Sequence, residues 1–367
     1  MFGTVLLSVA AFMHAYVFWR MWSFPRIRRY VSGRVIFLVG VFFWGLVVAG
    51  REYGHSNSGL PAVTLELVGM NWFIAVFLTF FLLLLTDLVT GFGFLFPKFA
   101  NRLRMGAFLA GGVLSCIALV QGVRPPVVDE LEIRISELPV ELDGTVVVGM
   151  SDLHIGSILR ANWLENRVDQ VLELKPDLVV LVGDIFEGHD PPGEDVLSAM
   201  SRLSAPMGVW AVPGNHDHYH RSSSAMDLLQ TLGIQVLANE WKEVRPGLIV
   251  SGVEDLTVHQ RSGRTDNLVS TALENSPKGA AILLSHSPLQ SEDAARKGID
   301  LMLSGHTHAG QVWPFGYLVR MQYPLFEGLY DVEGMQVYVS RGAGTWGPRM
   351  RLWKPGEIFR ITLRTGE

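Results

Sequence analysis

Cysteine is almost absent from this 367-residue chain, and charged residues are scarce. Cys116 is the only cysteine, so no disulfide forms within the chain, and cysteine usage does not indicate a redox compartment. Charged residues make up 18% of the chain, and the formal net charge is -5 at pH 7. Because nucleic-acid binding needs a concentrated basic surface and the sequence has no basic stripe, no nucleic-acid partner is expected.

Apolar residues are unevenly distributed, and this predicts two unlike regions. Almost all of the apolar excess lies before Arg124, after which charges mix with short apolar runs as in a globular domain. We therefore expect a helical membrane anchor over residues 1–123, a linker and first strand over 124–144, and a catalytic domain over 145–367.

Four stretches in the first region approach the roughly 20 apolar residues that a membrane-crossing helix needs. They run over residues 1–19, 35–50, 67–86 and 105–123, and the second is the shortest. The first stretch lacks the basic start and the small-residue cleavage site of a signal peptide, so we interpret it as a span. Few ionisable groups lie inside the stretches, which favours an anchor over a transporter.

Loop charge predicts which side of the membrane the globular domain faces. The connection over residues 20–34 is strongly basic, and Lys98, Arg102 and Arg104 make the third connection basic, whereas residues 51–66 carry one arginine and two glutamates. Basic loops stay on the cytoplasmic side. With four spans in the cell membrane, both termini and the catalytic domain are then extracytoplasmic; one span fewer would invert this orientation.

The second region alternates strand and helix patterns, which predicts an α/β architecture with helices covering the sheets. Residues 132–136 and 145–150 are expected to form a first pair of strands, joined by a turn at Asp143-Gly144. Helical patterns occupy residues 162–174, 196–203, 225–232 and 267–274. Further strands are expected at residues 178–182, 209–212, 248–252, 281–285, 301–304, 336–340 and 358–363.

Five of the predicted strands are followed directly by polar residues of the kinds that bind metals. The groups are Asp152-Leu-His154, Gly183-Asp184, Gly214-Asn215-His216-Asp217, Ser285-His286 and Gly305-His306-Thr-His308. Each group alone is more typical of a turn or a core histidine. Because ligands gather at the carboxyl ends of strands in α/β sheets, the five together predict one metal site.

The same residues resemble the calcineurin-like metallophosphoesterase superfamily, whose pattern is Asp-x-His, Gly-Asp, Gly-Asn-His-Asp/Glu, a His and Gly-His-x-His. The resemblance covers residues 145–365. The strings over residues 304–315 and 340–344 are similar to the membrane-associated branch, which includes transmembrane proteins with a metallophosphoesterase domain. Ala309 stands where that branch often has a glycine, a difference of one methyl group.

The resemblance implies a four-layered α/β/β/α sandwich, here preceded by about four transmembrane helices, and a site for two divalent metal ions. Asp152, His154 and His308 would hold the first ion, Asn215, His286 and His306 the second, and Asp184 would bridge them. Imidazole, carboxylate and amide ligands suit Mn, Fe or Zn. His216 would protonate the leaving oxygen or stabilise developing charge, and Asp217 would orient its imidazole.

A membrane anchor favours a lipid-linked phosphate or pyrophosphate as the substrate, with membrane lipids as partners. Residues 312–326 are rich in aromatic and aliphatic side chains, which suits either contact with acyl chains or a packed hairpin. Two alternatives stay open. One is a pyrophosphatase acting on UDP-diacylglucosamine in lipid A synthesis, whose cytosolic substrate disagrees with the predicted orientation, and the other is a non-catalytic membrane scaffold. The sequence does not distinguish phosphatase from phosphodiesterase activity, and it leaves the oligomeric state open.

Overall fold

The chain forms two compact units in a computed structural model that describes residues 2–366 except 55, 56, 58, 189, 190 and 220–223. The first unit contains residues 1–123 together with the short segment 347–352, and the second contains residues 124–346 and 353–367. The two units are described separately below.

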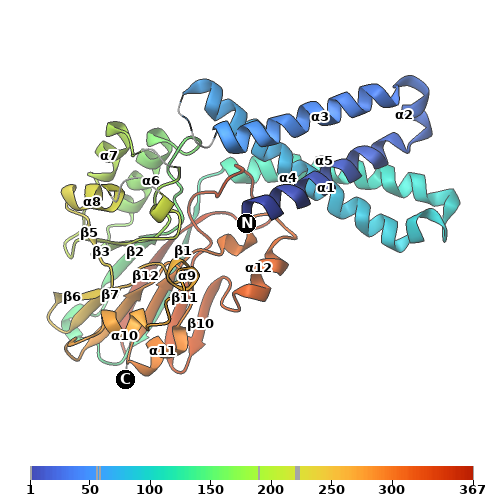
Figure 1. Cartoon of the computed structure of the whole chain (residues 1–367). Helices are drawn as coiled ribbons and strands as arrows, with labels where there is room; N and C mark the ends of the chain where they lie inside the picture. Colours follow the sequence, from blue (N-terminus) through green and yellow to red (C-terminus); the bar gives the residue numbers. More distant parts are fainter. Residues whose placement is uncertain (1, 55–56, 58, 189–190, 220–223, 367) are drawn as a thin grey trace. The chain divides into compact units, whose positions relative to one another are not determined.

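The first unit is built from helices, drawn blue to cyan in Figure 1. The longest of them, α4, packs against each of the other three long helices, α1, α3 and α5. The helices are α1 (Phe2–Trp22), α2 (Pro25–Tyr30), α3 (Gly33–Ala49) with its π-helical continuation η1 (Gly50–Gly54), α4 (Leu60–Val89), the 3₁₀ turn η2 (Gly91–Gly93) and α5 (Pro97–Val123).

Three helices among the described residues are long and apolar enough to cross a membrane, against the four predicted spans. They cover Gly33–Gly54, Leu60–Val89 and Pro97–Val123, and each extends beyond the apolar stretch expected from the sequence. The first predicted span coincides with α1, which is not among the three, and the side chains of residues 1–6 lie outside the described part of the chain.

A buried ionic cluster joins the helices α1, α4 and α5 at one end of the unit. The carboxylate of Asp87, on α4, lies 2.6 Å from Arg20 Nε of α1 and 2.7 Å from Arg104 Nε of α5, and it also accepts a hydrogen bond from Tyr16. All three ionic side chains are at least nine-tenths buried. Arg20 and Arg104, expected in basic loops, are therefore held inside the unit, because a buried carboxylate is stable only when it is paired.

The second unit contains two six-stranded sheets. Their strand orders are β1-β12-β2-β3-β4-β5 and β10-β11-β9-β8-β7-β6. The strands of the first sheet are β1 (Val127–Ile135), β2 (Val146–Met150), β3 (Leu178–Val182), β4 (Val209–Val212), β5 (Gln235–Val236) and β12 (Glu357–Thr365), and those of the second are β6 (Glu240–Arg245), β7 (Leu248–Gly252), β8 (Ala280–Leu284), β9 (Leu301–Ser304), β10 (Gly328–Val332) and β11 (Met335–Val339).

The sheets pack face to face and are covered by helices on their outer faces (Figure 1). Alternate residues of β3 show why: Leu178, Val180 and Val182 join the core between the sheets, whereas Val179 and Leu181 face the outer helices. The helices are α6 (Ala161–Glu173), α7 (Glu194–Met200) and α8 (Ser224–Thr231) on the first sheet, and α9 (Leu256–Arg261), α10 (Leu268–Ala272) and α11 (Ser291–Arg296) on the second. The predicted α/β/β/α layering is confirmed.

The predicted pairing of the first two strands is wrong. β12 lies between β1 and β2, parallel to β1 and antiparallel to β2, so the first strand pairs with the end of the chain rather than with its neighbour in sequence. Six short elements of this unit were also not expected from the sequence: β5, β6, β10 and the helices α9, α11 and α12 (Gly316–Gln322). β6, β10 and α12 are partly or fully exposed, and exposed elements lack the apolar periodicity on which the prediction depends.

The ionic cluster predicts that Asp87→Asn destabilises the first unit. Losing one charge from a buried pair leaves its partners uncompensated, and we expect the free energy of unfolding to fall by about 3 kcal/mol or more. Denaturant unfolding of the detergent-purified chain would measure the change. Glu52→Gln, in the partly exposed pair with Arg51, is the matched control and should change little. Equal losses in the two variants would contradict the role of the cluster.

Candidate metal centre

The residues predicted to bind metal lie at the carboxyl ends of strands in both sheets. β2, β3 and β4 are parallel neighbours in the first sheet, and β8 and β9 are parallel neighbours in the second. Parallel strands end at the same edge of a sheet, so the loops that follow them meet there.

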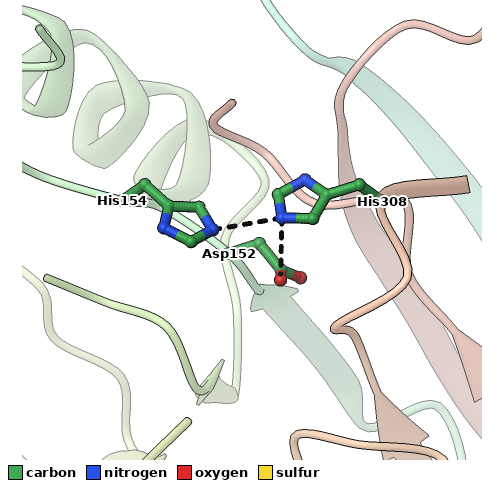
Figure 2. A group of neighbouring side chains, drawn as sticks. All are labelled: Asp152, His154 and His308. Atoms are coloured by element: carbon green, nitrogen blue, oxygen red, sulfur yellow. Dashed lines mark hydrogen bonds and ion pairs between the residues drawn. The ribbon is translucent and has the colours of Figure 1, made fainter. Parts of the chain in front are cut away.

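One group of three side chains forms at the end of β2, and Figure 2 shows them converging. His308 Nε2 lies 3.2 Å from Asp152 Oδ1 and 3.1 Å from His154 Nε2. All three residues are buried, and each has a potential ligand atom within 4.8 Å of the others. These are the three residues expected to hold the first ion.

A second group joins the two sheets through Asp184. Its Oδ2 atom lies 3.1 Å from His286 Nε2, and His286 Nε2 lies 3.3 Å from His306 Nδ1. The same Asp184 oxygen is 3.8 Å from His154 Nε2, in the first group. Asp184 therefore lies between the two groups, where a bridging ligand is expected.

The remaining predicted ligand, Asn215, supports the view that this cluster is made for a cation. Its side-chain oxygen is buried and has no hydrogen-bond partner among the described residues, an arrangement that costs free energy unless the oxygen binds something else. His286 Nδ1 lies 2.9 Å from the carbonyl oxygen of Val182. A proton on Nδ1 would leave Nε2 with a lone pair for a metal. The donor set thus fits a divalent ion.

The backbone at the centre is strained in a way that ordinary loops are not. Five of the seven predicted ligands have φ values in the left-handed region, which costs free energy for residues other than glycine. They are Asp152 (53°), His154 (47°), Asp184 (49°), His306 (71°) and His308 (50°). Such strain is maintained only where the surrounding contacts impose it, and it collects at functional sites.

Two glycines allow the loops after β4 and β9 to approach the carboxylates of Asp184 and Asp152 within hydrogen-bonding distance. A Cβ atom at Gly214 would lie 2.2 Å from Asp184 Oδ1, and one at Gly305 would lie 2.4 Å from Asp152 Oδ2. The backbone N–H groups of the next loop residues use this proximity. His216 donates to Asp184 Oδ1 at 2.8 Å, and His306 donates to the Asp152 carboxylate at 3.1 Å.

Comparison with known proteins agrees with this geometry. The model of the calcineurin-like phosphoesterase family matches residues 145–310. An uncharacterized metallophosphoesterase of Helicobacter pylori is 32% identical over 265 residues, covering 72% of this chain and 70% of that protein. This chain belongs to the calcineurin-like metallophosphoesterase family.

Other metallophosphoesterases are similar over comparable lengths. The transmembrane protein with metallophosphoesterase domain of Danio rerio is 34% identical, covering 70% of this chain and 62% of that protein. The uncharacterized metallophosphoesterase YkuE of Bacillus subtilis is 30% identical, covering 72% of this chain and 94% of that protein. The family and the enzyme class predicted from the sequence, a metallophosphoesterase, are confirmed. The three helices long and apolar enough to cross a membrane agree with the name of the transmembrane relative.

Glu187 is a site residue of this metallophosphoesterase that the sequence analysis missed. Its Oε2 atom lies 2.5 Å from His154 Nδ1 and 2.9 Å from His216 Nδ1, so one carboxylate contacts both imidazoles. Burial lowers the pKa of His216, but the negative charges of Glu187 and Asp184 outweigh it and raise this pKa to about 9. Glu187 lies three residues after Asp184, but Asp217 follows Asn215 at a similar spacing, so the sequence did not distinguish these two carboxylates.

The contacts of Asp217 are ones that its predicted role did not include. Its carboxylate accepts hydrogen bonds from the backbone N–H groups of Gly214 at 2.8 Å and of Ile185 and Phe186 at 3.1 and 2.9 Å. Asp217 therefore ties the loop after β4 to the loop after β3.

Other histidines close in sequence to the predicted ligands, and Arg341, occupy different surroundings. His218 is exposed, and His189 and His220 lie outside the described residues. Arg341 forms ion pairs with Asp129 and Glu357, each at 2.8 Å. These contacts favour a structural role for Arg341 over the gripping of a phosphate.

The two carboxylates near His216 are predicted to have separable roles. Glu187→Gln should lower kcat about 10- to 100-fold, since it weakens the orientation of His154 and His216. Asp217→Asn should mainly lower stability, by about 2 kcal/mol, because three backbone donors lose a charged acceptor. Hydrolysis of a soluble phosphate ester and thermal unfolding measure the two effects. If Asp217→Asn reduced kcat at unchanged stability while Glu187→Gln left kcat intact, the roles would have to be exchanged.

Proposed function

We propose that this chain is a metal-dependent hydrolase that cleaves phosphomonoester, phosphodiester or pyrophosphate bonds of a lipid-linked substrate, using two divalent ions. The observation that carries the proposal is the pair of ligand groups joined by Asp184, which lies 3.1 Å from His286 of one group and 3.8 Å from His154 of the other. A single mononuclear site would not need a carboxylate between two separate sets of imidazoles.

The residues around the centre suit in-line displacement at phosphorus. Divalent ions bound there would supply a water of lowered pKa and positive charge opposite the phosphoryl oxygens. His216, with its raised pKa, is protonated at neutral pH and so is able to give a proton to the leaving oxygen. Glu187 Oε2 lies 2.9 Å from Nδ1 of that imidazole and so orients the ring.

The donor set limits which ions would bind. Four imidazoles, two carboxylates and one amide oxygen favour Mn, Fe or Zn over ions that prefer thiolates or all-oxygen sites. Burial lowers the pKa of His306 to about 4. That imidazole is therefore neutral at pH 7, and neutral imidazole is the form that binds metal.

A lipid-linked substrate is supported by the chain's own membrane helices. α5, one of the three membrane-capable helices, ends at Val123, and β1 begins at Val127. Three intervening residues span at most about 10 Å, so the catalytic unit begins close to a membrane surface. Membrane lipids and a phosphorylated, lipid-linked substrate are the partners that this proposal names. A pyrophosphatase of the UDP-diacylglucosamine type is the narrower alternative.

Hydrolysis by matched variants tests the proposal. Purified chain loaded with Mn, Fe or Zn should cleave phosphate esters from a panel of soluble and lipid-linked probes, and His216→Ala should lower kcat about 10²- to 10⁴-fold. Asp184→Asn should lose bound metal as well as activity. His218→Ala, an exposed neighbour in the same loop, is the control and should keep activity. Inactivity of the wild type with every metal and lipid would favour the non-catalytic scaffold.

The orientation of the catalytic unit is a separate proposal. Basic residues concentrate in the connections at residues 20–34 and 98–104, and Asp87 holds Arg20 and Arg104 at the same end of the helical unit. Both basic connections thus lie on one side, which we propose is cytoplasmic. α5 begins at the second basic connection, so the catalytic unit that follows it is extracytoplasmic whether or not α1 also crosses; losing α1 as a span inverts only the N-terminus.

A reporter fused after Glu367 tests this orientation. An alkaline phosphatase fusion, active only outside the cytoplasm, should be active, and the matched fusion to a cytoplasm-restricted fluorescent protein should be dark. The opposite pattern would place the metal centre in the cytoplasm and would restore the UDP-diacylglucosamine alternative.

A further inference from the structure

The helix α12 presents an apolar face that the rest of the catalytic unit does not cover. Tyr317, Leu318 and Met321 are 66%, 60% and 83% exposed, and Phe315, just before the helix, is 42% exposed. Side chains of this size are usually buried. Four of them within seven residues form a concentrated apolar patch, which we call the α12 face, and such patches mark interaction sites.

The α12 face is not a loose surface turn, because the segment is fixed at both ends. A Cβ atom at Gly310 would lie 2.2 Å from the Cα atom of Gly316, so the start of the helix packs directly on the loop that carries His308. At the other side, Thr307 Oγ1 donates to the carbonyl oxygen of Phe326 at 2.6 Å. The exposed side chains are therefore held outward by a rigid backbone.

The same segment contacts the metal centre. Tyr323, immediately after α12, is 7% exposed, and its hydroxyl lies 2.9 Å from His306 Nε2. This contact leaves His306 Nδ1 facing His286. Tyr323 is thus a positioning residue for the predicted ligand His306. The α12 face ends at Met321, two residues before Tyr323 in the sequence.

The chemistry of the α12 face matches a membrane interface. It combines aromatic and aliphatic side chains with one cation, Arg320, whose guanidinium lies 4.7 Å from the ring of Phe326, and α12 contains no acidic residue. Aromatic rings and arginine are the residues that settle at the level of lipid headgroups. The same chain has helices long and apolar enough to cross a bilayer, which supports a bilayer as the partner of this face.

We propose that the α12 face lies in the interfacial layer of the bilayer that anchors the chain, and that it brings the metal centre to phosphate groups at the headgroup level. The contact with lipid stands without the proposed hydrolysis, whereas its benefit to catalysis rests on that proposed function. A second copy of this chain is the competing occupant, and the test below separates the two.

Fluorescence quenching in lipid nanodiscs tests the proposal on the full chain. In a Cys116→Ser background, Met321→Cys is labelled with a dye that reports polarity, and lipids carrying a nitroxide near the headgroup serve as the quencher. Val140→Cys is the matched control, since Val140 is an exposed apolar residue of the same unit with 78% exposure. We expect quenching at position 321 to exceed that at position 140 by about twofold or more, with a blue-shifted emission.

Iodide in the aqueous phase separates the possible outcomes. Protection from iodide together with quenching by the lipid nitroxide supports the proposal. Protection without lipid quenching indicates coverage by a second copy and overturns it, as does free access of iodide at both positions. The quenching experiment measures no turnover, so its result is independent of the hydrolysis assay. A chain that is inactive in the hydrolysis assay but quenched by lipid would refute the proposed hydrolysis and leave this inference standing.

Discussion

The buried carboxylate of Asp184 is the constraint on which the centre depends. It is 2% exposed, and a negative charge removed from water needs close partners. One partner is the backbone N–H of His216 in the first sheet, and another is His286 of the second sheet. The two sheets must therefore pack face to face with their strand ends aligned before Asp184 is satisfied. The core between the sheets, in which Val182 and Leu284 are both fully buried, provides this alignment.

The strained backbone at the ligands follows from the same requirement. Side chains leaving two sheets at their carboxyl ends would diverge if each loop followed a relaxed path. Left-handed residues at Asp152, Asp184 and His306 instead turn each loop sharply inward. At Asp184 the strained path is held by hydrogen bonds: the Asp217 carboxylate accepts from three backbone N–H groups in the loops after β3 and β4. The same hydrogen bonds therefore stabilise the fold and fix the geometry of the site.

Much of this arrangement was predictable, because apolar strands and the polar residues after them are local signals. The alternation of strands and helices and the five polar groups came from such patterns, whereas the order of layers and the division into two ligand groups were implied by the family resemblance. The contact of Glu187 with His216, in place of the predicted contact of Asp217, was not predictable in this way. Each of the two is a carboxylate within three residues of a predicted ligand, and only the path of the chain decides which one contacts His216. The pairing of β1 with β12 joins residues about 230 apart in sequence, and no local pattern carries that information.

The buried charges of the two units are balanced in different ways, and the difference bears on what the centre is for. In the helical unit, Asp87 has two arginines and a tyrosine as partners, so the protein itself completes the cluster. At the strand ends, imidazole nitrogens face one another at 3.1 Å and 3.3 Å, and the buried oxygen of Asn215 has no partner among the described residues. Each facing pair of nitrogens can share one proton, whereas an amide oxygen can only accept. The buried Asn215 oxygen is therefore the observation at the strand ends that supports the proposed cation.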